Sequence, residues 1–172
     1  MEERFKKDFG RALRYAQTLG AKHLHIMSGV AEGDEARATF VNNLRWATAE
    51  APEQSLTIEP INNETMRGYF LNDFDLAREI VTAIDAPNLG LQFDTFHAAK
   101  ITGDVLGTWA AMRDITSHVQ VAQVPDRGEP DQGEIDYPAF FENLDAHGYQ
   151  GWVAGEYKPR KTTGDGLGWI AG

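Results

Sequence analysis

The chain has 172 residues, 42% of them hydrophobic and 24% charged, which are ordinary values for one globular domain that buries a core. The net charge of −10 at pH 7 argues against a nucleic-acid partner, because such proteins usually carry a basic face. The absence of cysteine excludes disulfides and thiolate zinc sites. No apolar run is long enough for a membrane span and no signal-peptide pattern opens the chain, so we expect a cytoplasmic enzyme without a membrane partner.

Helical and strand periodicities alternate along the sequence. Strands are predicted over residues 22–27, 55–59, 89–94, 118–123 and 152–156. Helices are predicted over 2–19 and 34–50, after an N-cap at Asp73, over 104–116, and after an N-cap at Asp136, with a short last helix over 167–170. Five strands in βα alternation predict an α/β fold with a parallel sheet. A closed eight-stranded barrel would need about 250 residues.

The strand that precedes Pro60 ends in a carboxylate. Leu56 and Ile58 share one face of this strand, whereas Thr57 and Glu59 share the other. Pro60 has no N–H to donate, so the strand pairing should stop there. We therefore expect Glu59 at the C-terminal end of its strand, where α/β folds usually place their chemistry.

Three later strands repeat this construction and carry Asp94, Gln120 and Glu156 at the corresponding places. The intervals between these residues are each close to the length of one βα unit, about 30 residues. Together with Glu59, they would point inward at one rim of a parallel barrel. Four oxygen-donor side chains that converge in this way are typical of a divalent metal site.

Four segments carry a resemblance to a known family: Leu56–Asn62, Leu91–His97, His118–Arg127 and Gly155–Pro159. In this order and spacing they resemble hydroxypyruvate isomerases, within the xylose isomerase-like TIM-barrel superfamily. The resemblance runs from about Phe5 to Trp169. It implies a partial TIM (β/α) barrel of about five parallel strands, which correspond to strands four to eight of the family, in one domain over 1–172. The first three βα units of the family have no counterpart here, so we expect a second copy or another polypeptide to cover an open barrel edge.

The resemblance also implies a set of site residues. The divalent metal, Mg²⁺ or Mn²⁺, would be held by Glu59, Asp94, Gln120 and Glu156. Of these, Glu59 and Glu156 would also form the acid/base pair, and His97 and Arg127 would contact substrate oxygens. Gln120 favours the hydroxypyruvate branch, because sugar epimerases of the superfamily usually have a histidine there. The implied substrate is a small hydroxy-oxo acid, with hydroxypyruvate and 2-hydroxy-3-oxopropanoate interconverted through an enediolate.

Other interpretations stay open at this point. The same metal and glutamates would suit a ketose 3-epimerase or another sugar isomerase, and a chain without three strands would also suit an inert fragment or a subunit completed by a partner. A metal-dependent abasic-site nuclease is disfavoured by the net charge. The site residues have plain structural alternatives: a solvated or helix-capping carboxylate for Glu59 and Glu156, a helix N-cap for Asp94, an interior amide for Gln120, a packing role for His97 and a solvated charge for Arg127. We interpret His23 and His25 as structural.

Overall fold

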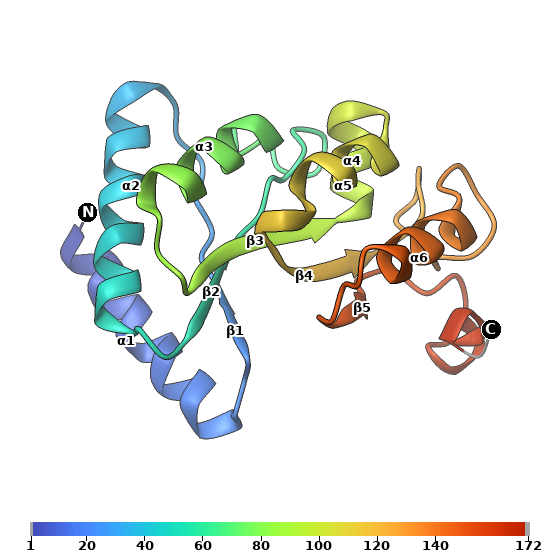
Figure 1. The fold of residues 1–172 in the computed structure, drawn as a ribbon, viewed down its shortest axis with the longest axis horizontal. Coiled ribbons are helices and arrows are strands. Elements are labelled where there is room, and N and C mark those ends of the chain that lie inside the picture. Colours follow the sequence, from blue (N-terminus) through green and yellow to red (C-terminus); the bar gives the residue numbers. More distant parts are fainter. Residues whose placement is uncertain (1, 171–172) are drawn as a thin grey trace. The chain divides into compact units, whose positions relative to one another are not determined.

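The computed structural model describes residues 2–170 and consists of strands and helices in alternation (Figure 1). The strands are β1 (His23–His25), β2 (Ser55–Ile58), β3 (Leu89–Asp94), β4 (Thr116–Val121) and β5 (Val153–Gly155). The α-helices are α1 (Glu2–Leu19), α2 (Gly33–Glu50), α3 (Phe74–Ile84), α4 (Thr95–Thr102), α5 (Val105–Met112) and α6 (Tyr137–Ala146). The strands follow the order β1-β2-β3-β4-β5 in one sheet, and the pairs β1–β2, β2–β3 and β4–β5 are parallel. The predicted α/β class with five parallel strands is confirmed.

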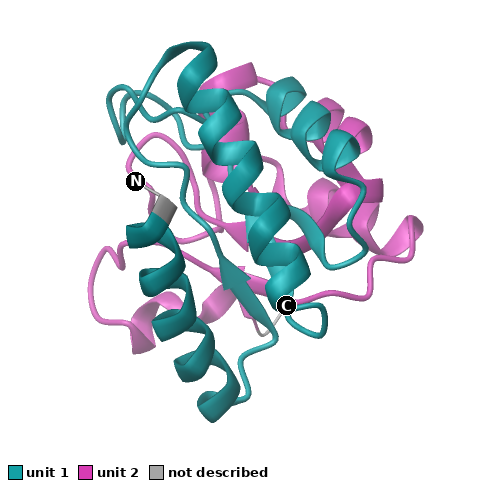
Figure 2. Cartoon of the chain, turned by 90° about the vertical axis from the view of Figure 1, so that its left-hand side faces the viewer, with its two compact units in different colours: residues 1–92 teal, residues 93–172 magenta. Residues whose placement is uncertain are grey.

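Two compact units divide the chain, and the boundary falls inside β3 (Figure 2). Unit 1 comprises residues 1–92, and unit 2 comprises residues 93–172. The prediction of a single domain over the whole length stays a prediction.

Unit 1 packs α1, α2 and α3 with β1, β2 and the first part of β3. In β2, Leu56 and Ile58 are fully buried, and Ile58 is in register with Leu91 of β3. Burial of both faces is expected of a parallel strand that lies between neighbours and under helices. The Asp73 side chain caps α3 by accepting a hydrogen bond from the Leu76 amide at 2.8 Å, as predicted.

Unit 2 is built around a cluster of aromatic rings. The ring of Phe93, in β3, lies 5.4 Å from that of Trp109 in α5 and 6.1 Å from that of Phe140 in α6, measured between centroids. All three side chains are fully buried. The Asp136 side chain caps α6 by accepting from the Ala139 amide at 3.1 Å, which confirms the second predicted N-cap. This cluster joins α5 and α6 to the last part of β3.

Two helical predictions differ from the structure. The helix α4 was not predicted, because residues 95–102 show no apolar stripe long enough to stand out from a loop. The helix predicted over 104–116 is shorter: α5 ends at Met112, a 3₁₀ turn covers Arg113–Ile115, and β4 begins at Thr116. In the part of the chain that the structure describes, no helix is both long and apolar enough to cross a membrane.

Candidate active site

Glu59 directly follows β2, at the place the sequence predicts. The strand ends at Ile58, and Pro60 comes two residues later, so the strand pairing stops where the proline removes a donor. The Glu59 side chain is buried, and its Oε2 accepts a hydrogen bond from Nε2 of Gln92 at 2.9 Å. A carboxylate in this position is oriented by a neighbouring strand of its own unit, since Gln92 belongs to β3.

His25 also faces Glu59 within unit 1. Its Nε2 lies 3.6 Å from Oε2 of Glu59, which is close enough for an ion pair whenever the imidazole is protonated. From the sequence we interpret His25 as structural, although strand parity places this residue on the interior face. The sequence signal for this residue was therefore its alternation with Leu24, which is in register with Leu56 of β2.

Asp94 is the last residue of β3, and its two carboxylate oxygens accept hydrogen bonds from different partners. Its Oδ1 accepts hydrogen bonds from the amides of Phe96 at 2.7 Å and His97 at 3.2 Å, which makes Asp94 the N-cap of α4. Its Oδ2 accepts from Nη2 of Arg127 at 2.9 Å. The helix N-cap considered for Asp94 is therefore present, and the second carboxylate oxygen faces the charged group of Arg127.

Arg127 brings Asp94 and Glu156 together in unit 2. The same Nη2 atom that contacts Asp94 also contacts Oε2 of Glu156, and Nε of Arg127 donates to the Glu156 carbonyl oxygen at 3.2 Å. Glu156 follows β5 directly, and its amide donates to the Val121 carbonyl at the end of β4. The ends of β4 and β5 therefore set the Glu156 carboxylate beside the guanidinium.

His97 lies next to the same guanidinium and is almost fully buried. Its Nε2 is 3.4 Å from Nη1 of Arg127. Because arginine only donates, Nε2 is the accepting nitrogen and the proton of the neutral ring is on Nδ1. Burial and, to a smaller extent, the charge of Arg127 together lower the pKa of His97 to about 3, so the ring is neutral near pH 7.

Gln120 is the second-last residue of β4, where it is half-buried and in register with Ala154 of β5. Glu156 lies two residues beyond Ala154, so it follows the same side of its strand under period-2 alternation. The roles assigned to Glu59, Asp94, Gln120, Glu156, His97 and Arg127 stay predictions.

The residues of unit 2 fit the predicted divalent cation. Two carboxylate oxygens, Oδ2 of Asp94 and Oε2 of Glu156, already converge on one positively charged nitrogen of Arg127. Carboxylate oxygens are the ligands that Mg²⁺ and Mn²⁺ prefer. Glu59, a buried carboxylate of unit 1, belongs to the same chemical class. The donor set therefore suits a hard metal ion.

The buried position of Asp94 makes the stability of the chain depend on pH. The pKa of Asp94 is raised to about 7, mainly by burial and further by the charge of Glu156, while Arg127 and the two amide hydrogen bonds oppose the rise. Between about pH 4 and pH 7 the folded state therefore holds a proton that the unfolded state has released, and stability should fall as the pH rises through this window. His97, with its lowered pKa, works in the opposite direction over the same range.

Substitution of Asp94 separates its contribution to the pH dependence of stability from that of His97. We expect the free energy of unfolding of the wild type, minus that of Asp94→Asn, to decrease from pH 4 to pH 7, because only the wild type must bury an ionised carboxylate at the upper end. Urea denaturation of both proteins across this range measures the difference, and the contribution of His97 is common to both. A difference that does not change with pH would contradict the expectation.

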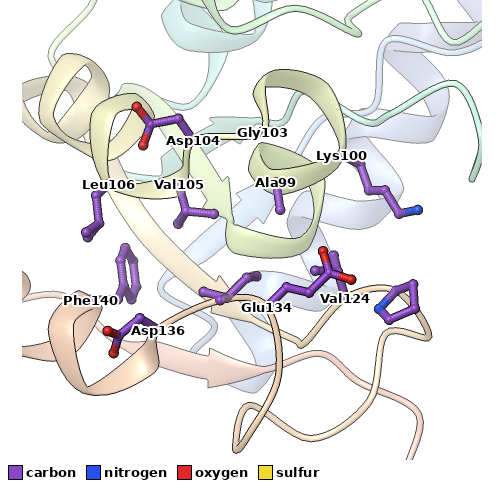
Figure 3. Close-up of a pocket in the computed structure, with 12 residues that line it drawn as sticks. Ala99, Lys100, Gly103, Asp104, Val105, Leu106, Val124, Glu134, Asp136 and Phe140 are labelled. Atoms are coloured by element: carbon purple, nitrogen blue, oxygen red, sulfur yellow. The ribbon is translucent and has the colours of Figure 1, made fainter.

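A cavity in unit 2 lies apart from these residues. It has a volume of about 350 Å³ and is lined by residues of α4 and α5, by Val124 and Pro125, and by the segment that leads into α6. Figure 3 shows Glu134 and Asp136 on that segment, across from Ala99 and Val105. None of the six predicted site residues lines it, so its shape carries no information about the predicted chemistry.

Comparison with known proteins identifies the relatives of the chain. The sequence profile described as xylose isomerase-like TIM barrel matches residues 1–172. A 2-oxo-tetronate isomerase from Cupriavidus necator is 45% identical, over 98% of this chain and 67% of the relative. The hydroxypyruvate isomerase of Escherichia coli is 35% identical, over 98% of this chain and 68% of the relative. The chain thus spans about two thirds of the length of these curated relatives.

Solved structures give the same result for the fold. A protein from Brucella melitensis described as an AP endonuclease of family 2 superimposes with a TM-score of 0.94 at 42% identity, over 99% of this chain and 68% of that one. A D-psicose 3-epimerase from Clostridium cellulolyticum reaches a TM-score of 0.76 at 19% identity, over 94% of this chain and 60% of that one, which supports the fold alone. The predicted correspondence to part of a TIM barrel is therefore confirmed.

The curated relatives agree in enzyme class. Those from Cupriavidus necator and Escherichia coli are both named isomerases, and so is a putative hydroxypyruvate isomerase of Homo sapiens that is 39% identical over 96% of this chain and 64% of its own length. The predicted resemblance to hydroxypyruvate isomerases and the predicted isomerase class are both confirmed by these relatives. The chain belongs to the xylose isomerase-like TIM-barrel family, in its group of hydroxypyruvate and 2-oxo-tetronate isomerases.

Proposed function

We propose that the chain forms part of a metal-dependent isomerase. This isomerase acts on small hydroxy-oxo acids, with hydroxypyruvate as the substrate. The observation that carries this proposal is the convergence of Asp94 and Glu156 on Arg127 in unit 2, in a family of named isomerases. A pair of carboxylates beside a cationic fork offers both a proton-transfer group and a partner for the carboxylate of a 2-oxo acid. The names of the relatives support this substrate class, since hydroxypyruvate and 2-oxo-tetronate are both 2-oxo acids.

The reaction moves a carbonyl group between neighbouring carbons. One glutamate removes a proton from carbon 3 of hydroxypyruvate, which produces an enediolate with a double bond between carbons 2 and 3. The other glutamate delivers a proton to carbon 2, while the hydroxyl proton passes from the oxygen of carbon 3 to that of carbon 2. No atom is gained or lost, and the product is 2-hydroxy-3-oxopropanoate. General acid–base catalysis of this kind contributes about 10²- to 10⁴-fold in rate.

Glu59 and Glu156 are the proposed acid/base pair. Each directly follows the C-terminal end of a parallel strand, β2 and β5, and each matches a glutamate in the family motifs. Glu59 is buried and held by Gln92, whereas Glu156 is exposed beside Arg127. This part of the proposal rests on the resemblance and on the strand positions.

Glu59, Asp94, Gln120 and Glu156 are the proposed ligands of Mg²⁺ or Mn²⁺. When bound, the cation would supply Lewis-acid stabilisation of the negative charge that develops on the substrate oxygens. His97, which is neutral and buried beside Arg127, is the proposed hydrogen-bond partner of a substrate oxygen. Arg127 is the proposed partner of the substrate carboxylate.

The proposal is tested by measuring isomerisation by the purified chain with added Mg²⁺ or Mn²⁺, with EDTA as the control for metal dependence. We expect metal-dependent conversion of hydroxypyruvate and loss of activity in EDTA. The four-carbon acid 2-oxo-tetronate and the ketose D-psicose are compared at equal concentration, because the named relatives and the solved structures include both kinds of activity. Faster conversion of a free ketose than of either acid would replace the proposal by a sugar isomerase.

A second assay addresses the description of the Brucella melitensis structure as an AP endonuclease. We expect no cleavage of a duplex that contains an abasic site, because the net charge of −10 opposes binding to a phosphate backbone. Cleavage that depends on metal and declines with salt would contradict this expectation.

We also propose, from the resemblance to the family alone, that another chain covers the open edge of the partial barrel. A second copy of the chain or another polypeptide would supply the strand pairing that three further βα units supply in the family. Light scattering of the active preparation gives the solution mass, and a mixture of active dimer and inactive monomer would support a second copy. A folded, metal-binding chain without turnover would instead support a subunit that needs a partner chain.

A further inference from the structure

Arg127 has a backbone conformation that L residues rarely adopt. Its φ is 58°, in the left-handed region that strains any residue with a Cβ atom. The neighbouring hydrogen bonds hold it there: its carbonyl oxygen accepts from the Lys158 amide at 2.7 Å, and the Gly128 amide donates to Oδ1 of Asp126 at 3.1 Å. Non-glycine residues in this region cluster at functional positions, where the surrounding structure fixes them.

All three guanidinium nitrogens of Arg127 contact groups of unit 2. Nη2 contacts both Asp94 and Glu156, Nε donates to the Glu156 carbonyl oxygen, and Nη1 lies 3.4 Å from Nε2 of His97. The face of the guanidinium lies over the ring of Phe96, with Cζ 5.1 Å from the ring centroid, a distance typical of a cation–π contact. Each nitrogen of the Arg127 guanidinium, and one face of it, therefore contacts a protein group.

The same two carboxylates are the proposed ligands of the divalent cation in unit 2. A guanidinium and a divalent cation cannot both contact Oδ2 of Asp94 and Oε2 of Glu156, because like charges at such short range repel strongly in a partly buried site. We propose that Arg127 is the resident counter-cation of the Asp94–Glu156 pair and that its Nη2 must leave these two oxygens when a divalent cation binds them. The inference rests on the proposed metal-dependent function and extends it to the order of events.

Displacement would also prepare Arg127 for the substrate. A guanidinium released from Asp94 and Glu156 regains donors that point into the site, while the Phe96 ring and the backbone bonds on either side of Arg127 keep it nearby. The fork can then take a substrate carboxylate in a bidentate geometry. Metal binding would thus precede the binding of the acid, and the two would be coupled through one side chain.

The alternative is that Arg127 only ties the loop after β4 to the end of β5. Arg160 provides the matched control for that role, because it joins the same loop to the segment after β5. Its Nη1 donates to both carboxylate oxygens of Asp131, at 3.0 and 3.1 Å, and it pairs with Asp126 and Glu129. Removing the Arg160 side chain perturbs the loop without removing the charge beside Asp94.

The test is the affinity of the chain for Mn²⁺, measured from the signal of free Mn²⁺ by electron paramagnetic resonance in oxygen-free buffer at pH 8.5. We expect Arg127→Met to bind Mn²⁺ about tenfold or more tightly than the wild type, and Arg160→Met to bind within about twofold of it. Arg127→Lys, which keeps the charge and loses the fork, should fall between wild type and Arg127→Met. Equal or weaker binding by folded Arg127→Met would overturn the displacement.

A second measurement uses the wild type alone and so does not depend on how the variants fold. Addition of Mg²⁺ should shift the side-chain Nε–H resonance of Arg127 in a ¹⁵N NMR spectrum and leave that of Arg160 unchanged. A saturating Mg²⁺ effect elsewhere in the spectrum with an unmoved Arg127 signal would overturn the proposal.

These outcomes separate the inference from the proposed function. Tighter Mn²⁺ binding by Arg127→Met, together with no turnover of hydroxypyruvate by the wild type, would support displacement and contradict isomerase activity of this chain on its own. Metal-dependent turnover by the wild type, together with an unchanged Mn²⁺ affinity of Arg127→Met, would support the isomerase proposal and contradict displacement. An absence of Mn²⁺ binding in both proteins would overturn the two together.

Discussion

Replacing Glu59 or Glu156 by glutamine is expected to reduce the isomerisation of hydroxypyruvate by at least about 10²- to 10⁴-fold, the contribution of a general acid or base. Glutamine has nearly the same shape as glutamate and cannot take up or release the proton at neutral pH. At position 59 the new side-chain oxygen can still accept the hydrogen bond from Nε2 of Gln92. The fold of unit 1 should therefore persist.

The experiment compares initial rates at saturating metal for wild type, Glu59→Gln and Glu156→Gln. Glu53→Gln serves as the control, because Glu53 is exposed in the turn before β2 and should leave the rate unchanged. Far-UV circular dichroism checks that each variant is folded. A rate close to that of the wild type in either Glu59→Gln or Glu156→Gln would refute a mechanism that uses two glutamates.

The largest expected loss of stability is that of Phe93→Ala, at about 3–5 kcal/mol. Phe93 is fully buried between Trp109 and Phe140, so removal of the ring leaves a cavity with aromatic walls that cannot close without moving β3, α5 or α6. Ring–ring contacts of this geometry add to the free energy of simple burial. Many domains have only about 5–15 kcal/mol of total stability, so this variant would be close to unfolding.

Urea denaturation followed by tryptophan fluorescence measures the loss, since Trp109 reports directly on the cluster. Phe93→Leu, which keeps most of the volume, should lose much less. Tyr15→Ala is the surface control, because Tyr15 is 66% exposed in α1 and surface changes usually stay within about 0.5 kcal/mol. Equal stabilities of Phe93→Ala and Tyr15→Ala would show that the aromatic cluster does not stabilise unit 2.

The strand ends were predictable because local signals agree there. Around Glu59, the alternation of Leu56 and Ile58 and the missing donor of Pro60 both indicate the same end point, and the structure has it at Ile58. Asp73 and Asp136 were recognisable as N-caps because each precedes a clear apolar stripe. In these places, local propensity and tertiary packing favour the same conformation.

The surroundings of Arg127 were not predictable from local patterns. Its left-handed conformation is fixed by contacts with Lys158 and Glu156, about thirty residues further along the chain, which no window of sequence contains. The α4 helix was missed for a related reason: it is short, and its first turn is stabilised by the side chain of Asp94, which motif reasoning had reserved for a metal. From the sequence, both a metal ligand and a helix N-cap were left open for Asp94, and the local pattern did not show that a helix follows it.

The two carboxylate oxygens of Asp94 have different partners, and this affects how selectively the site can bind a cation. A free aspartate samples several rotamers, and a ligand that binds it must pay for stopping that motion. In this chain the amides of Phe96 and His97 already hold Oδ1, so the carboxyl plane has a fixed orientation before anything arrives. In the proposed exchange only Oδ2 would change its partner, so the preference for Arg127 or for a divalent cation would depend on charge and geometry and little on the entropy of fixing the side chain.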